Sequence, residues 1–148
     1  FMEKDSKRVE KIQETMKKID KFINSQKSIH LYPKVKKSFK IVLKKLSDEE
    51  YKKITNKLYL MVLHEDAVGQ VMHFSKTNDK FKILQLSIAK EVPMYVLNYV
   101  IAHELGHVLQ DRNWKKSDGD KLEVDADETA ERWGFPKTKK IKDWYLKR

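Results

Sequence analysis

The stretch that is most informative about the fold is VIAHELGHVL, residues 100–109, in an apolar segment that begins at Pro93 and runs to about Gln110. We expect this segment to form one long α-helix, because its apolar side chains recur every three or four residues. His103 and His107 are four residues apart, so they lie one turn apart on the same face and both imidazoles can reach one metal ion. A separate stripe, turned away from the two histidines, predicts the face that packs in the core: Leu97, Ile101, Leu105 and Val108.

Glu104 and Gly106 complete an H-E-x-x-H pattern that has a glycine inside it. Glu104 is expected to project beside the metal position, where a carboxylate can take a proton from a metal-bound water and later return it to a leaving amine. Gly106 has no side chain, so a neighbouring element can approach the helix closely at that turn. A short H-E-x-x-H match also occurs by chance, and the pattern therefore needs support from a third ligand.

A candidate for the third ligand follows on a second predicted helix, which runs through Trp133 with Asp120 as a possible N-cap. The chain has no cysteine, so any metal must be held by histidine and carboxylate side chains. Glu123 and Asp127 are four residues apart and share a face. We predict that Glu123 binds the metal, leaving one position open for water, and that Asp127 accepts a hydrogen bond from the far nitrogen of a ligating histidine. Other carboxylates could be the third ligand or simply part of a solvated face: Asp125, Asp127 and Glu128.

At these residues the chain resembles the gluzincin branch of the zinc metallopeptidases. Residues 100–109 are similar to the active-site helix of the ImmA/IrrE-like peptidases and the minigluzincins, and residues 123–127 to the third-ligand helix of HtpX-type peptidases. The resemblance covers roughly residues 94–135. It implies one Zn²⁺ per chain, although manganese, iron or cobalt could occupy the same ligands, and hydrolysis of peptide bonds with Glu104 as general base. It also implies an edge strand that pairs with an extended substrate, for which residues 81–87 are the candidate.

Peptidases of this kind usually use a further side chain to stabilise the tetrahedral oxyanion. Tyr99 lies one turn before His103 on nearly the same face, so it is the nearest candidate. The other candidates are His64, His73, Arg132 and Tyr145. Aromatic residues and single histidines more often pack in a fold than act in a site, so each candidate taken alone is more often structural.

The sequence predicts an α+β fold in a single domain, residues 1–148, with the catalytic part at about 58–135, and the resemblance implies that this fold is zincin-like. It would combine N-terminal helices, a small sheet, the H-E-x-x-H helix and the third-ligand helix. Three short runs rich in β-branched and aromatic residues predict a mostly antiparallel, three-stranded sheet. These runs are residues 58–63, 68–74 and 81–87.

Three helices are expected before the sheet. An amphipathic helix over about residues 3–28 carries an apolar stripe, which suits packing on the domain's own core better than a coiled coil with a partner. Residues 33–46 predict a second helix, although part of that run alternates as a strand would. Ser47 followed by Glu50 is a capping-box pattern that predicts the start of a short third helix.

The charge of the chain bears on its partners. The net charge is +10, which favours polyanions or acidic proteins, but the lysines are spread along the chain. Nucleic acid is therefore a possible but less favoured partner, and the resemblance to metallopeptidases implies a peptide or protein substrate. No apolar run reaches the roughly 18 to 20 residues that cross a bilayer, and the charged N-terminus lacks the apolar core of a signal peptide, so we expect a cytoplasmic location.

Two other functions remain open alongside a zinc peptidase. One is a non-catalytic module that uses a zincin scaffold to bind nucleic acid or a regulatory protein. The other is a latent peptidase whose N-terminal helix covers the cleft. The substrate and the oligomeric state are left open by the sequence.

Overall fold

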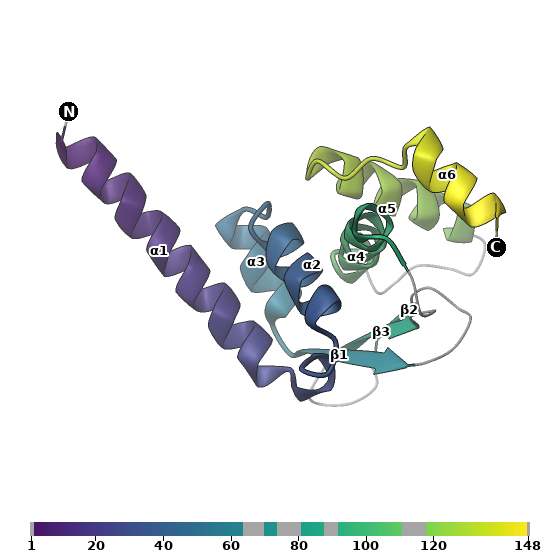
Figure 1. Cartoon of the computed structure of the whole chain (residues 1–148), viewed down its shortest axis with the longest axis horizontal. Coiled ribbons are helices and arrows are strands. Elements are labelled where there is room, and N and C mark those ends of the chain that lie inside the picture. Colours follow the sequence, from purple (N-terminus) through teal and green to yellow (C-terminus); the bar gives the residue numbers. More distant parts are fainter. Residues whose placement is uncertain (1, 64–69, 74–80, 88–91, 111–117, 148) are drawn as a thin grey trace.

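The computed structural model describes residues 2–63, 70–73, 81–87, 92–110 and 118–147. In this part of the chain the fold is α+β and mostly helical, with a small sheet at one end of the helical body (Figure 1). The elements are α1 (Met2–Ser25), the short 3-10 helix η1 (Lys27–Ile29), α2 (Pro33–Leu43), α3 (Asp48–Thr55), β1 (Leu58–Leu63), β2 (Gln70–His73), β3 (Lys82–Ser87), α4 (Met94–Val108), α5 (Gly119–Arg132) and α6 (Lys139–Leu146).

The three predicted strands are present, but the order and one pairing differ from expectation. The sheet has the order β1-β3-β2, in which β1 runs parallel to β3 and β2 runs antiparallel to it. The expected antiparallel pairing is therefore wrong for β1 and β3. The prediction that residues 81–87 form the edge strand is also wrong, because β3 lies in the centre. Strand order depends on contacts between distant segments, and the residue pattern within each short run does not encode those contacts.

The outer edge of β1 is closed by polar side chains from the segment around η1. The Gln26 side chain, only 8% exposed, donates Nε2 to the carbonyl of Leu58 (3.1 Å) and accepts from the amide of Leu60 (2.9 Å). One step along the strand, the amide of Val62 donates to Ser28 Oγ (2.9 Å). These side chains satisfy the backbone groups that a neighbouring strand would otherwise bond.

The N-terminal helices follow their sequence signals closely. Pro33 occupies the first turn of α2, where its missing N–H has no partner to lose. Phe39 and Val42 of α2 are fully buried, so residues 33–43 form a helix and not a strand. The capping box of α3 is confirmed: Glu50 N donates to Ser47 Oγ (3.2 Å) and Ser47 N donates to Glu50 Oε1 (3.0 Å).

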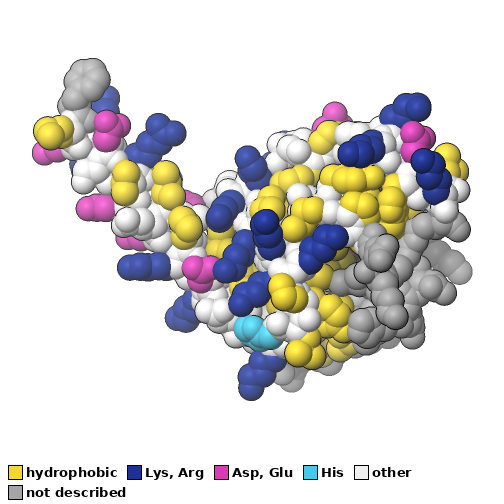
Figure 2. Space-filling model, viewed as in Figure 1, with side chains coloured by type: hydrophobic (Ala, Val, Ile, Leu, Met, Phe, Trp, Pro, Cys, Tyr) yellow, Lys and Arg dark blue, Asp and Glu magenta, His cyan; other side chains and the backbone are white. Residues whose placement is uncertain are grey.

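Helix α1 packs on the rest of the protein over only part of its length. Ile19 and Ile23 are 1% and 0% exposed, whereas the continuation of the same stripe at Val9, Ile12 and Met16 is 52%, 51% and 43% exposed. The N-terminal half of the helix projects from the body into solvent (Figure 1, Figure 2). The prediction that this stripe packs on the domain's own core is therefore confirmed only for its C-terminal half.

Among the described helices, none combines the length and the apolar character that crossing a membrane requires.

Candidate metal centre

The candidate metal centre lies where α4 and α5 pack closely together. Gly106 makes this approach possible, because a Cβ atom at that position would lie 3.2 Å from the carbonyl oxygen of Ala126 and 3.3 Å from its Cα. Ala126 and Ala130, on the facing side of α5, are both fully buried. Small residues on both helices thus bring their backbones together, as the position of Gly106 in the sequence predicted.

The three predicted metal ligands converge on one point. His103 Nε2 lies 3.0 Å from Glu123 Oε2, and His107 Nε2 lies 3.2 Å from Glu123 Oε1. The two imidazole Nε2 atoms are 3.1 Å apart. The histidine side chains are 12% and 16% exposed, while the Glu123 side chain is 63% exposed. The two imidazoles therefore lie on the protein side of the centre, and the Glu123 carboxylate lies on the side that faces solvent.

Asp127 lies behind His103, as the spacing on α5 predicted. His103 Nδ1 donates to Asp127 Oδ1 over 2.8 Å, since an ionised carboxylate can only accept. The same carboxylate oxygen accepts the hydroxyl of Tyr99, a residue that is only 4% exposed. Burial and the hydrogen bond to Asp127 raise the pKa of Tyr99 above its usual value, so the hydroxyl stays protonated. This contact favours a positioning role for Tyr99, behind Asp127, over the predicted oxyanion role.

Gln110 lies behind His107 and was not predicted from the sequence as a site residue. His107 Nδ1 lies 2.7 Å from Gln110 Oε1, and Gln110 Nε2 donates to the carbonyl of Leu122 over 2.6 Å. A signal for it existed, because residue 110 is three positions after His107 and such pairs are neighbours on a helix surface. The two histidines thus differ in their support, a carboxylate for His103 and a neutral amide for His107.

Glu104 is the most buried acidic side chain of the centre, with 7% of the residue exposed. Burial raises the pKa of its carboxyl to about 7; the His107 imidazole lowers it and the Glu123 carboxylate adds to the rise. A carboxyl with a pKa near neutrality can both accept and return a proton under ordinary conditions. This property fits the predicted role of general base.

The remaining candidates for oxyanion stabilisation lie in different parts of the chain. Arg132 donates Nη2 to Glu50 Oε2 over 2.8 Å, at the far end of α5 from Glu123, so its guanidinium joins α5 to α3. Tyr145 of α6 lies near Tyr99, because Lys137 Nζ is 6.0 Å and 5.9 Å from the centres of the two rings. His64 lies outside the described residues, and His73 belongs to β2 but its side chain is not among those described.

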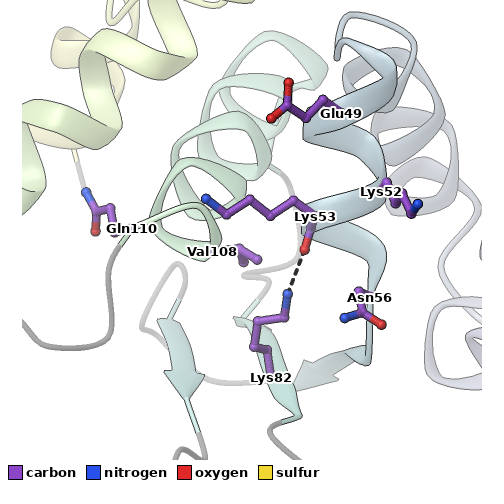
Figure 3. Close-up of a pocket in the computed structure, with 7 residues that line it drawn as sticks. All are labelled: Glu49, Lys52, Lys53, Asn56, Lys82, Val108 and Gln110. Carbon is purple, nitrogen blue, oxygen red and sulfur yellow. Dashed lines mark hydrogen bonds between the residues drawn. The ribbon is translucent and has the colours of Figure 1, made fainter.

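A separate pocket of about 590 Å³, lined mostly by polar residues, lies between α3, β3 and the end of α4 (Figure 3). Lys82 Nζ donates to the carbonyl of Lys53 (2.9 Å) and to that of Ile54 (3.3 Å), which places its charge at the C-terminus of α3. Gln110 also lines this pocket. The side chain that contacts His107 therefore borders both the pocket and the metal centre.

Comparison with known proteins gave no match: neither a family of proteins, nor a curated protein, nor a solved structure is similar to this chain.

Proposed function

We propose that the chain is a zinc-dependent peptidase of the gluzincin type, with His103, His107 and Glu123 as metal ligands and Glu104 as general base. The observation that supports it most is the spacing of the ligand atoms. Three ligands bound tetrahedrally at about 2.0–2.1 Å from zinc lie roughly 3.3 Å from one another. Here the two imidazole Nε2 atoms are 3.1 Å apart, and the carboxylate of Glu123 lies 3.0 Å from that of His103 through Oε2 and 3.2 Å from that of His107 through Oε1. These separations fit one zinc ion with little adjustment.

The chemistry follows from the residues around this point. A bound zinc would polarise the peptide carbonyl and acidify a water molecule. Glu104 would take a proton from that water and pass it to the leaving amine, a role that suits a buried carboxyl with a pKa of about 7. Asp127 would hold His103 in one orientation and increase its basicity. The low exposure of Glu104 limits competing contact with bulk water.

The sheet suggests where an extended substrate would lie. The outer edge of β1 is bonded by Gln26 and Ser28, and β3 is paired on both sides. Within the described part of the chain, β2 has a strand on one side only, and it runs antiparallel to β3. We therefore place substrate pairing at Gln70–His73 in β2, in place of residues 81–87.

Metal content is the first test. Purified wild-type chain should hold about one zinc per chain, and His103→Ala and Glu123→Ala should each lose it. Glu128→Ala is the matched control, because Glu128 is an exposed carboxylate on the same helix. Absence of zinc from the wild type, after zinc is supplied and the excess removed, would exclude the metal centre.

Cleavage is the second test. The zinc-loaded chain should cleave members of a random peptide library, and Glu104→Gln should lower the rate by about 10²–10⁴-fold while keeping its zinc. Zinc binding without cleavage of any library peptide would favour the alternative function, a non-catalytic module that binds nucleic acid or a regulatory protein.

One observation favours that second function, a scaffold that binds a polyanion such as nucleic acid. Residues 1–63 contain 17 Lys and Arg against 8 Asp and Glu, whereas residues 64–148 contain 15 against 14. The lysines are spread along the chain, but the acidic residues are not, so nearly all of the net charge belongs to the N-terminal helices and β1. Binding to DNA that weakens steeply with salt, and that Glu104→Gln leaves unchanged, would support this function.

The latent form has less support. Helix α1 contacts α2 with its C-terminal half, and its N-terminal half points away from α5 (Figure 1). In this arrangement α1 does not cover the candidate metal centre.

A further inference from the structure

We infer that the pocket between α3, β3 and the end of α4 binds a small organic phosphate. Its volume of about 590 Å³ lies in the range of pockets that hold small ligands. None of the three proposed metal ligands lines it, so the inference depends neither on zinc nor on peptide cleavage. It follows from a buried ammonium group, from a second ammonium group beside it and from the carbon surface around them.

The buried ammonium belongs to Lys82, at the start of β3. Lys82 is only 5% exposed, yet it lines the pocket. Its Nζ donates to the carbonyls of Lys53 (2.9 Å) and Ile54 (3.3 Å) at the C-terminus of α3, and Figure 3 shows the first of these contacts. Lysine is almost never buried this deeply unless its charge has a partner. The two carbonyls fix the ammonium in one place, so the pocket holds a positive charge whose position the fold sets in advance.

The second ammonium belongs to Lys53, in α3. Figure 3 shows its side chain extending from α3 toward the end of α4, whereas Lys52 points away from it. Among the described residues, no carboxylate forms an ion pair with the Lys53 ammonium. Glu49, one turn earlier, is the one acidic residue among the described residues that line the pocket. The pocket therefore carries an excess of positive charge, which favours an anion.

The rest of the lining distinguishes an organic anion from a bare ion. The methylene groups of Lys52 and Lys53, together with Val108, offer carbon surface, and the Asn56 amide can both donate and accept. An organic group would cover this surface, which inorganic phosphate would leave exposed. A phosphate monoester carries nearly two negative charges at neutral pH, because its second pKa is about 6. Such a dianion matches two ammonium groups better than a carboxylate does.

The test is the binding of phenyl phosphate and of inorganic phosphate to the ¹⁵N-labelled full chain, followed by NMR at neutral pH through the backbone amides of Lys53, Lys82 and Val108. We expect both compounds to shift these amides, phenyl phosphate at the lower concentration. Phenol has no charge and benzoate has one, so both should bind more weakly. Benzoate binding as tightly as phenyl phosphate, or no shift with either phosphate at millimolar concentration, would overturn the inference.

Substitutions at Lys53 test the charge. Lys53→Met should weaken the binding of phenyl phosphate by about 3–10-fold, because a partly exposed ammonium is lost, and Lys53→Arg should largely preserve it. Lys37→Met is the matched control, because it removes the same charge from an exposed position on α2 that does not line the pocket. An equal loss in Lys53→Met and Lys37→Met would assign binding to net charge alone and overturn the inference.

Two further variants identify the place of binding. Glu49→Gln should strengthen binding by about 2–3-fold, since a like charge is removed, and a weakening would overturn the inference. Glu123→Ala should leave binding unchanged, whereas its loss there would place the phosphate on the metal and overturn the inference. Wild-type chain that binds phenyl phosphate in the pocket but holds no zinc would remove the proposed function alone.

Discussion

The N-terminal half of α1 and the α4–α5 pair both carry apolar side chains at helical spacing, but in opposite surroundings. Along α4, Ile101 and Leu105 are fully buried, and α5 approaches so closely that a single added carbon at Gly106 would contact its backbone. Along α1, Ile12 lies on the same stripe as Ile19 and is 51% exposed. An apolar stripe is therefore buried only where the rest of the chain supplies an opposite surface.

This difference separates residues that stabilise the fold through burial from exposed residues that contribute little to its stability. Burial at α4 and α5 fixes the ligands of the candidate metal centre within hydrogen-bond distance of one another. The exposed half of α1 contributes charge and an apolar stripe but little packing. Substitutions should thus have effects that decrease from α4 toward the tip of α1.

The largest effect on stability is expected from Leu105→Ala in α4. Leu105 is fully buried, so removing its side chain should lower the free energy of unfolding by about 2–5 kcal/mol, through lost burial and the cavity that remains. Urea denaturation followed by circular dichroism measures this directly. A loss below about 1 kcal/mol would show that the packing between the helices is looser than the structure indicates.

Gly106→Val should separate α4 from α5. The first added carbon would already lie 3.2 Å from the Ala126 carbonyl oxygen and 3.4 Å from Thr129 Cβ, and valine adds two methyl groups beyond that carbon. We expect overpacking to lower stability by about 1–3 kcal/mol and zinc affinity to fall more than stability alone would explain. Retention of wild-type zinc affinity would argue that Glu123 follows the metal and not the position of α5.

Glu50→Gln tests the contact that joins the N-terminal helices to α5. Partial burial raises the pKa of Glu50, but hydrogen bonds from Arg132, from Ser47 and from Trp133 outweigh it and hold the pKa below its ordinary value. A lowered pKa means stability that is present above the unfolded-state value and is lost as the pH falls through the folded-state value. At neutral pH we expect a loss of about 1 kcal/mol, because the Arg132 and Trp133 donors lose a charged acceptor.

The pH dependence provides the control for this substitution. The difference in unfolding free energy between wild type and Glu50→Gln should shrink as the pH falls below the ordinary Glu value of about 4.3 and through the lower folded-state value, because the wild-type carboxyl then becomes protonated as well. An equal difference at neutral and at acidic pH would assign the effect to shape and not to charge.

The smallest effect is expected from Ile12→Ala in α1. Half of this residue is already exposed, so the free energy of unfolding should change by less than about 0.5 kcal/mol. The measurement should be repeated at high protein concentration. A loss that grows with concentration would show that a second copy covers the stripe, and the contrast with α4 would then hold only for the single chain.

The sequence alone predicted what depends on helix geometry. Residues four apart share a helix face whatever surrounds them, so the placement of His103, His107, Glu123 and Asp127 could be inferred from spacing. The capping box at Ser47 is local in the same sense. Gly106 also indicated from the sequence that another element could approach this helix closely.

The features that escaped prediction depend on contacts between distant segments. The central position of β3 depends on which strands pair with it, and the pattern of its own six residues does not determine those partners. Gln110 has its role only because the Leu122 carbonyl lies opposite it. Tyr99 shares the face of His103 as expected, but the carboxylate of Asp127 decides where its hydroxyl bonds.

The closure of β1 by Gln26 and Ser28 has a further consequence for behaviour at high concentration. Propagation of a cross-β assembly requires each unit to present two free strand edges, one to receive the preceding chain and one to template the next. In the described sheet the β1 edge is already bonded by side chains that are covalently part of the same chain. A strand from another molecule could thus pair with β2, but no further strand could then pair with β1. Strand addition would therefore stop after one step, which should protect the folded chain from fibril growth.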